Sequence, residues 1–239
     1  AHLVEIPGLP LQLLEALIEA AAGKRLALVG GAVRDLLLHR VHNDPWRDLP
    51  DLDLVLEGEA QGLLERLPIQ ALHSRSHVAF GTVEFELEIA SETWLVDLAS
   101  ARRELYPAPG QNPLISSGSL EDDLARRDFS VNAMALLLDP DGVGTVLLDP
   151  HGGQADLAVR QLRLLHPQSL QDDPTRLLRA ARYAARLGFS LSLDSQQQAR
   201  QTLAAWPWRW SHGDDPAKAP PALGSRLRME LELLLEREP

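Results

Sequence analysis

The stretch of sequence that decides the fold runs from residue 28 to residue 56. It begins with Leu28-Val29-Gly30-Gly31-Ala32-Val33-Arg34-Asp35 and, after a polar segment with two prolines, ends with Asp51-Leu52-Asp53-Leu54-Val55-Leu56. The first part predicts a short buried strand over 25–29, a glycine turn, and a helix over 32–38. The second part alternates charged and apolar residues and is followed by Gly58, which predicts another strand and its end.

The second strand carries two carboxylates. Asp51 and Asp53 are two residues apart, so on a strand both point to one face, while the intervening leucines point into a core. Two carboxylates forced together repel each other unless a cation lies between them. Mg²⁺ fits this position because it takes oxygen ligands and keeps coordination sites open for substrate phosphates. The alternative is a solvated acidic face on an edge strand.

The glycine turn favours the metal interpretation. Glycines let a phosphate approach the backbone, and the N-terminus of the helix that follows attracts anions. Arg34 falls in the first turns of that helix, within reach of such a phosphate. The Gly-Gly pair alone is a weak signal, since any tight turn uses it, but its combination with Asp-x-Asp is specific.

Composition limits the class of protein. The chain has 239 residues, 45% hydrophobic and 24% charged, which is the balance of a globular protein with one large domain or two small ones. No apolar run reaches the roughly 18 residues of a spanning helix, and residues 1–10 lack the pattern of a signal peptide. The absence of cysteine excludes disulfides and thiolate chemistry. We expect a cytoplasmic protein without a membrane partner.

Charge is unevenly distributed along the chain. The net charge of −11 argues against a nucleic-acid binder when the chain is taken as a whole. Residues 1–148 carry 11 basic and 23 acidic side chains, whereas residues 149–239 carry 12 basic and 11 acidic ones. Apart from Lys24 and Lys218 every basic residue is Arg, which contacts phosphates and base edges through two parallel hydrogen bonds. A compositional bias of the genome is the alternative.

The pattern of elements predicts an α+β fold with two parts. We expect a head over residues 1–148 with a small mixed sheet, and an all-α neck over residues 149–239. Further predicted helices cover 11–22, 60–67, 172–187, 195–205 and 225–237, and 126–138 is a helix or a helix running into a strand. Further predicted strands lie within 78–89 and 93–99. The proline-rich segment 105–120 is predicted as a long loop, and 206–223 as an irregular insertion.

Five segments together resemble one known family. Besides residues 28–56, they are Arg126-Arg127-Asp128-Phe129-Ser130-Val131-Asn132-Ala133-Met134-Ala135, then Asp149-Pro150-His151-Gly152-Gly153, then Asp172-Asp173-Pro174-Thr175-Arg176, and, weakly, residues 226–235. In this order they resemble the motifs of bacterial class II tRNA nucleotidyltransferases, which are the CCA-, CC- and A-adding enzymes, and of the related poly(A) polymerases. The resemblance implies a polymerase-β-type nucleotidyltransferase head.

The resemblance implies roles for the head residues. Asp51 and Asp53 would be catalytic and would hold Mg²⁺. A third carboxylate on a neighbouring strand often joins them, for which Asp97 is the first candidate and Glu86 the second, with a solvated strand face as the alternative for both. We expect Glu84 and Glu88 to be solvated only.

The same resemblance assigns a triphosphate site. Gly30, Gly31 and Arg34 would contact the triphosphate on one side, and Arg127 on the other, with Asn132 nearby. Asp35 and Asp128 are expected to be structural, each holding an adjacent arginine through an ion pair.

The helix expected from Asp173 onward resembles the family's nucleotide-reading helix. At 100° per residue, Leu177, Ala181 and Ala184 form an apolar face. The nucleotide-binding candidates Asp173, Arg176, Arg179 and Arg182 fall on the remaining arc. Asp173 would accept a hydrogen bond from the exocyclic amine of cytosine or adenine, and Arg176 would donate to the neighbouring ring acceptor. A solvated arginine-rich helix with an acidic N-terminus is the alternative.

The resemblance implies an activity with defined substrates. The chain would transfer CMP or AMP from CTP or ATP to the 3′ end of tRNA and release pyrophosphate, without a protein partner. The alternatives are a poly(A) polymerase and an inactive nucleotide- or RNA-binding module. The family usually has Glu-Asp where this sequence has Asp172-Asp173. Because the sequence ends soon after the last motif, we expect a head and a neck without the body and tail domains of longer relatives.

Overall fold

The computed structural model describes residues 6–47, 52–138 and 146–237. Asp51 lies outside the described residues. The chain forms two compact units. Unit 1 comprises residues 1–103, 116–127 and 132–154, and unit 2 comprises residues 104–115, 128–131 and 155–239. The sequence placed a single division at residue 148, whereas two short segments of the first part belong to unit 2.

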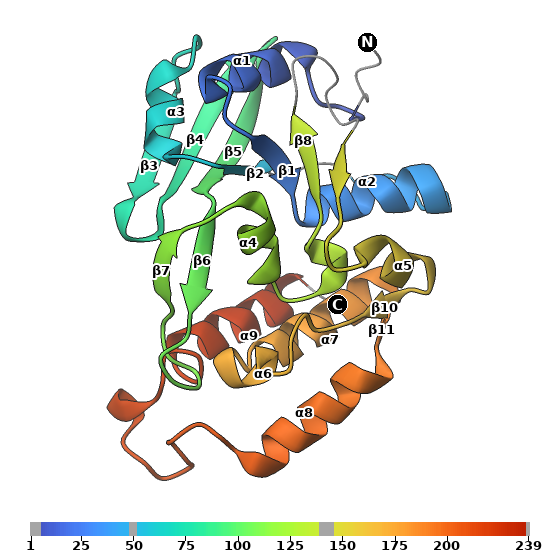
Figure 1. Cartoon of the computed structure of the whole chain (residues 1–239), viewed down its shortest axis with the longest axis vertical. Helices are drawn as coiled ribbons and strands as arrows, with labels where there is room; N and C mark the ends of the chain where they lie inside the picture. Colours follow the sequence, from blue (N-terminus) through green and yellow to red (C-terminus); the bar gives the residue numbers. More distant parts are fainter. Residues whose placement is uncertain (1–5, 48–51, 139–145, 238–239) are drawn as a thin grey trace. The chain divides into compact units, whose positions relative to one another are not determined.

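Unit 1 is built on a seven-stranded mixed sheet (Figure 1). Its strand order is β3-β4-β5-β2-β1-β8-β9, and only β2 and β5 run parallel, all other neighbours being antiparallel. The strands are β1 (Leu26–Val29), β2 (Leu52–Leu56), β3 (His73–His77), β4 (Thr82–Ile89), β5 (Glu92–Ser100), β8 (Ala135–Leu138) and β9 (Leu147–Leu148). β1 is buried along its whole length, which places it at the centre of the core.

The helices of unit 1 follow the apolar pattern of the sequence. They are α1 (Leu11–Ala21), α2 (Gly31–His42), α3 (Ala60–Arg66) and α4 (Leu120–Ala125). α1 and α3 contact each other, α3 packs on β4 and β5, and α2 packs on β1 and β2. α1 ends where Ala22 and Gly23 adopt positive φ angles, as the predicted stop at Gly23 requires.

One expectation for the segment 105–138 is wrong, and one of the two alternatives for its last part is confirmed. The expected loop contains β7 (Leu114–Ser117), which pairs with β6 (Arg102–Leu105). Within 126–138 a short helical turn runs into a strand, which is the second of the two predicted alternatives, and the α-helix α4 lies before this segment and ends at Ala125. Ser119 starts it, because its hydroxyl accepts the Asp122 N–H while the Asp122 carboxylate accepts the Ser119 N–H. A turn of 3₁₀ helix, Ser130–Asn132, then leads to β8.

Unit 2 is mainly helical. Its helices are α6 (Ser169–Asp172), α7 (Arg176–Leu187), α8 (Leu193–Ala205) and α9 (Ser225–Arg237), and α5 (Gly153–Ala158) bridges the division along the chain. α7 contacts α6 and α9, and α6 contacts α8. The expected all-α neck also holds a short parallel pair of strands, β10 (Gln161–Leu162) and β11 (Ser190–Leu191). Within the described residues no helix is both long and apolar enough to cross a membrane.

Candidate active site

The glycine turn after β1 brings three predicted site residues together. Gly30 has a φ of 69° and a ψ of −133°, a backbone conformation that favours glycine. A Cβ atom at Gly30 would lie 3.1 Å from Nη1 of Arg127 and 3.7 Å from Oδ2 of Asp53. The absence of a side chain therefore leaves the turn open beside a carboxylate and a guanidinium.

A row of carboxylates crosses the sheet next to this turn. Asp53 on β2 is the register partner of Asp97 on β5, and Asp97 is the register partner of Glu84 on β4. Register partners share one face of a sheet, and neighbouring strands lie about 4.8 Å apart. Glu86 is paired with Leu95 instead and so lies outside this row. Glu84 was expected to be solvated only; it is exposed, and it also stands in line with Asp97.

The row lines a cleft of about 310 Å³ within unit 1. Side chains of opposite charge face this cleft: Asp53, Asp97 and Glu84 on the sheet, and Arg126 and Arg127 after α4. Among the residues described, no group of three or more Asp, Glu or His is arranged to hold a metal ion.

Asp123 holds both cleft arginines, a role that sequence reasoning missed. This residue is 0% exposed. Its Oδ1 accepts from Nη2 of Arg126 at 2.7 Å, and its Oδ2 accepts from Nη2 of Arg127 at 3.1 Å. The spacing of three and four residues across the end of α4 was the available signal, since such pairs face each other on a helix.

Arg34 lies close to the glycine turn, since a Cβ atom at Gly31 would lie 3.4 Å from its Nη2. Its side chain donates from Nε and Nη2 to the two oxygens of Asp35, at 2.8 and 3.0 Å, and from Nη1 to Oδ1 of Asn132 at 2.8 Å. The arginine is 4% exposed, and neither it nor Asn132 is among the described residues that line the cleft. The ion pair expected between Asp35 and its neighbour is confirmed. Direct contact of Arg34 with a triphosphate stays a prediction.

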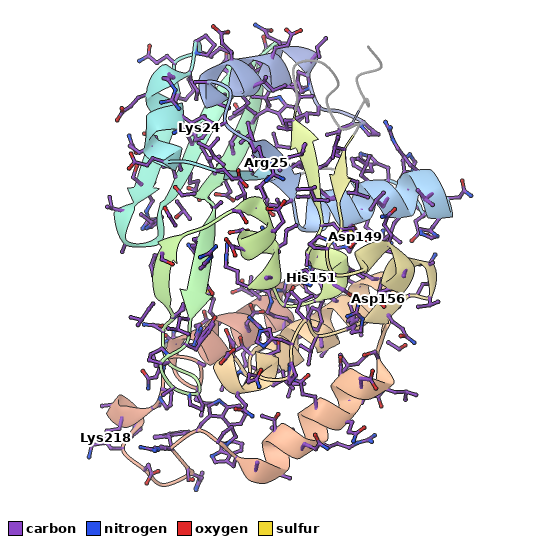
Figure 2. The ribbon with its side chains drawn as sticks, viewed as in Figure 1. Lys24, Arg25, Asp149, His151, Asp156 and Lys218 are labelled. Carbon is purple, nitrogen blue, oxygen red and sulfur yellow. The ribbon has the colours of Figure 1, made fainter. Side chains whose placement is uncertain are left out.

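The motif segment at residues 149–153 caps the N-terminus of a helix. Asp149, labelled in Figure 2, accepts hydrogen bonds from the N–H of Gly153 at 2.6 Å and of Gln154 at 3.0 Å. These are the first N–H groups of α5, which have no partner within the helix. The aspartate of this motif therefore stabilises the start of α5.

In unit 2, Asp173 does not begin the long helix. It has an extended backbone between α6 and α7, because the following Pro174 disfavours the helical conformation at residue 173. Its Oδ1 accepts from the N–H and the hydroxyl of Thr175, at 3.0 and 2.6 Å, and its Oδ2 lies 3.2 Å from Nη1 of Arg226. Burial raises the pKa of the neighbouring Asp172, and Arg176 partly offsets this.

The predicted apolar face of α7 is wrong. Ala181 is exposed and Leu177 half-buried, whereas Arg176 and Arg182 are buried. The arginines can be buried because carboxylates and hydroxyls from other elements meet them. Glu230 on α9 pairs with Arg179 at 2.9 Å and with Arg182 at 3.2 Å, while Nη1 of Arg176 donates to the hydroxyl and carbonyl of Ser169.

Asp128 is structural, with a distant partner. Its carboxylate lies 2.7 Å from Nη2 of Arg179 and raises the pKa of that guanidinium well above its ordinary value. The sequence suggested an adjacent arginine, but Arg127 is held by Asp123.

The chain matches one protein-family model and several known proteins. The poly A polymerase head domain matches residues 26–163. An A-adding tRNA nucleotidyltransferase of Halalkalibacterium halodurans is 42% identical over 207 residues, which cover 82% of this chain and 44% of the relative. A CC-adding tRNA nucleotidyltransferase of Deinococcus radiodurans is 42% identical over 217 residues, which cover 90% and 51%.

Solved structures agree with these relatives. The Thermotoga maritima CCA-adding enzyme complexed with tRNA is 31% identical with a TM-score of 0.70, over 95% of this chain and 47% of that one. A tRNA-processing enzyme in an apo form has a TM-score of 0.73 at 31% identity, over 99% and 55%. The chain thus spans about half the length of these relatives. It belongs to the family of bacterial class II tRNA nucleotidyltransferases and poly(A) polymerases.

Proposed function

We propose that this chain transfers CMP or AMP from CTP or ATP to the 3′ end of tRNA and releases pyrophosphate. The observation that carries the proposal is the alignment of Asp53 with Asp97 beside the open turn at Gly30, with Arg127 against that turn. The backbone at Gly30, which a phosphate can approach, therefore lies beside a carboxylate and a guanidinium that line one cleft. The A-adding and CC-adding activities of the two relatives support the same reaction.

The reaction is a displacement at phosphorus. The 3′ hydroxyl of the RNA attacks the α-phosphorus, a new O–P bond forms, and the bond from the α-phosphorus to the bridging oxygen of pyrophosphate breaks. The hydroxyl proton passes to solvent or to a carboxylate of the row. Arg127, and Arg126 beside it, neutralise the charge that develops on the phosphates. Asp123 keeps both guanidiniums in place while this occurs.

Members of this family generally use divalent metal ions, and we propose Mg²⁺ for this chain. The residues fit, because Asp53 is exposed at the cleft and its register partner Asp97 adds a second carboxylate on the same face. An all-oxygen donor set is the one that Mg²⁺ prefers. With Asp51 as a further ligand, these residues would hold the ion. When bound, it lowers the pKa of the attacking hydroxyl and stabilises the leaving pyrophosphate.

We propose Asp173 and Arg176 as readers of the base, with Arg179 and Arg182 in support. Asp173 accepts from Thr175 and pairs with Arg226, so its carboxylate has a fixed orientation. A carboxylate fixed in this way accepts from the amine of cytosine or adenine and leaves a carbonyl of uracil or guanine without a donor. Arg226→Gln is expected to lower discrimination against UTP and GTP, with Arg228→Gln as the matched control because Arg228 is exposed and pairs with Glu232 on its own helix.

The test of the proposal is a transfer assay with labelled CTP and ATP, each offered separately. The acceptors are tRNA that ends at the discriminator base and tRNA that ends in CC. Addition of one to three nucleotides supports the proposal, and its product identifies the nucleotide. Because the matching family model describes a poly A polymerase head domain, a long ladder of AMP would establish the second candidate, a poly(A) polymerase. Binding of nucleotide without transfer would show that the chain is a nucleotide-binding module and not an active transferase. We place the activity in the cytoplasm, where tRNA and both nucleotides occur.

A further inference from the structure

The strand order gives the active-site cleft two different ends. Going across the sheet, the Gly30 turn follows β1, Asp53 lies on β2, Asp97 on β5 and Glu84 on β4. His77, on β3, closes the series and also lines the cleft. Neighbouring strands lie about 4.8 Å apart, and several strands separate the glycine end of the cleft from the β3 end. A single phosphate or base therefore cannot occupy both ends.

The chemistry of the proposed reaction assigns a substrate to each end. In phosphoryl transfer the attacking and the leaving oxygen lie roughly in line on opposite sides of the phosphorus. The open turn at Gly30 and the guanidinium of Arg127 mark the end where the triphosphate, and hence the leaving pyrophosphate, is held. The attacking hydroxyl therefore approaches from the opposite end, where β4 and β3 lie.

At that end a short turn presents apolar side chains to solvent. The turn joins β3 to β4 between His77 and Thr82, both of which line the cleft. Within it, Val78 is 91% exposed and Phe80 is 50% exposed. An exposed aromatic ring next to a cleft is a surface on which a nucleic-acid base can stack, whatever its sequence.

Hydrogen bonds hold the backbone of this turn. The carbonyl of Phe80 accepts from Nη1 of Arg102 at 2.6 Å. Gly81 has a φ of 60°, its N–H donates to the carbonyl of Val78 at 3.2 Å, and its carbonyl accepts from the N–H of Ser100 at 2.8 Å. Phe80 is thus presented from an anchored backbone, which lowers the entropic cost of binding against its ring.

Two basic side chains lie on β3, the strand that leads into this turn. Arg75 is the register partner of Glu84, and His77 is the register partner of Thr82, so both share the sheet face of the carboxylate row. Both are exposed. Arginine on such an edge contacts phosphates of a nucleic-acid backbone without reading its sequence.

We propose that Arg75, His77 and Phe80 form the subsite for the 3′-terminal nucleotide of the acceptor RNA. The terminal base stacks on Phe80, and Arg75 and His77 contact the last phosphates of the strand. The 3′ hydroxyl then lies over the carboxylate row, on the side away from the pyrophosphate. This assignment rests on the proposed function and adds to it the residues that bind the second substrate.

Steady-state kinetics of Phe80→Ala in the whole chain test the subsite. The acceptor is a tRNA minihelix with CTP or ATP as the second substrate. We expect the KM for the minihelix to rise about tenfold, since stacking on one aromatic side chain contributes that much or more, while the KM for the nucleotide is unchanged. Phe80→Trp should restore the acceptor KM. Leu72→Ala is the matched control, because Leu72 is 49% exposed and immediately precedes β3, at the end away from the turn.

A minihelix with 4-thiouridine at its 3′ end gives a second, independent readout. Irradiation should link it to the peptide that contains residues 75–80. An unchanged acceptor KM in Phe80→Ala, a rise in the nucleotide KM instead, or a crosslink elsewhere would overturn the subsite. In that case loss of transfer in Asp53→Asn would leave the proposed function intact, whereas retained transfer in Asp53→Asn would contradict the proposed function itself.

Discussion

Asp97 stands directly opposite Asp53 in the parallel pairing of β2 and β5, which is the one parallel pairing in the seven-stranded sheet. The two residues are 44 positions apart in sequence, yet the register puts their carboxylates on one face at neighbouring strands. Each strand is secured by buried neighbours, since Leu52, Leu54, Val96 and Leu98 are all at most 2% exposed. The core therefore sets the distance between the two acids.

Asp97→Asn is expected to lower kcat by at least about 100-fold, because it removes a charged oxygen ligand from the proposed metal site. Folding should persist, since the side chain is only half-buried and the amide keeps its shape. Glu88→Gln is the matched control, because Glu88 is exposed on the same face of β4 but lies outside the cleft. Transfer rates at saturating substrates check this, and equal rates for the two variants would show that Asp97 has no part in catalysis.

A comparison of Gly30→Ala with Gly188→Ala separates the effect of backbone strain on stability from the effect of a blocked active site on activity. Both glycines have a φ of 69°, but Gly188, with a ψ of 28°, is in the ordinary left-handed region, whereas Gly30 has a ψ of −133°. Only at Gly30 would a Cβ meet other atoms, namely Arg127 and Asp53. Gly188→Ala should lose about 1 kcal/mol of stability from the strained backbone, and Gly30→Ala about 3 kcal/mol. Only Gly30→Ala should also lower kcat/KM for the nucleotide, by about 100-fold, as expected for misplaced catalytic groups. Thermal unfolding and transfer kinetics measured on both variants provide the check, and a similar loss of activity in Gly188→Ala would contradict it.

Asp123→Asn should destabilise unit 1 by about 3 kcal/mol, because it leaves two guanidiniums without their shared buried carboxylate. It should also raise the KM for the nucleotide, since Arg126 and Arg127 lose their orientation. Glu121→Gln on the same helix is the control, as it weakens the half-exposed pair with Arg25 and should cost less than about 1 kcal/mol. Urea denaturation compares the two, and the expectation fails if their midpoints coincide.

The phenol of Tyr106 is expected to lose its proton at an unusually high pH. Burial, and next the nearby carboxylate of Glu104, raise its pKa to about 12. The unfolded chain releases this proton near pH 10, so the stability that the neutral phenol contributes is complete below pH 10 and is lost as pH rises toward 12. Tyr183→Phe leaves Tyr106 as the only tyrosine, and its tyrosinate absorbance should then appear near pH 12. A transition near pH 10 in the folded protein would show that the phenol is solvated.

Local sequence signals were sufficient for the parts of the site that lie close together in the chain. The Gly-Gly turn and the strand that bears Asp53 are formed as predicted, because each depends on backbone geometry and on a run of a few apolar residues. The ion pair of Arg34 with Asp35 also follows from adjacency. The same holds for α9, whose predicted bounds are those of the structure.

Features that depend on distant partners were not predictable in this way. Glu84 joins the carboxylate row only through the register of two strand pairs, which no single segment encodes. On α7, Arg182 is buried where Glu230 meets it and Arg176 is buried where Ser169 meets it, so helical periodicity alone identified the wrong face. The sequence does contain a local signal for the interruption between α6 and α7, because Pro174 disfavours the helical conformation at Asp173. The helical pattern on both sides of Pro174 nevertheless led to the prediction of one continuous helix.

The most direct test of the account is the transfer of labelled CMP or AMP to a tRNA minihelix by the Asp53→Asn chain, in parallel with the unaltered one. The side chain is exposed at the cleft, so the variant should fold with an unchanged melting temperature. We predict that transfer falls by at least about 1,000-fold, in line with the loss of a preorganised charged group at the reacting centre. Transfer at an undiminished rate by a folded Asp53→Asn chain would contradict the claim that this carboxylate row is the catalytic centre.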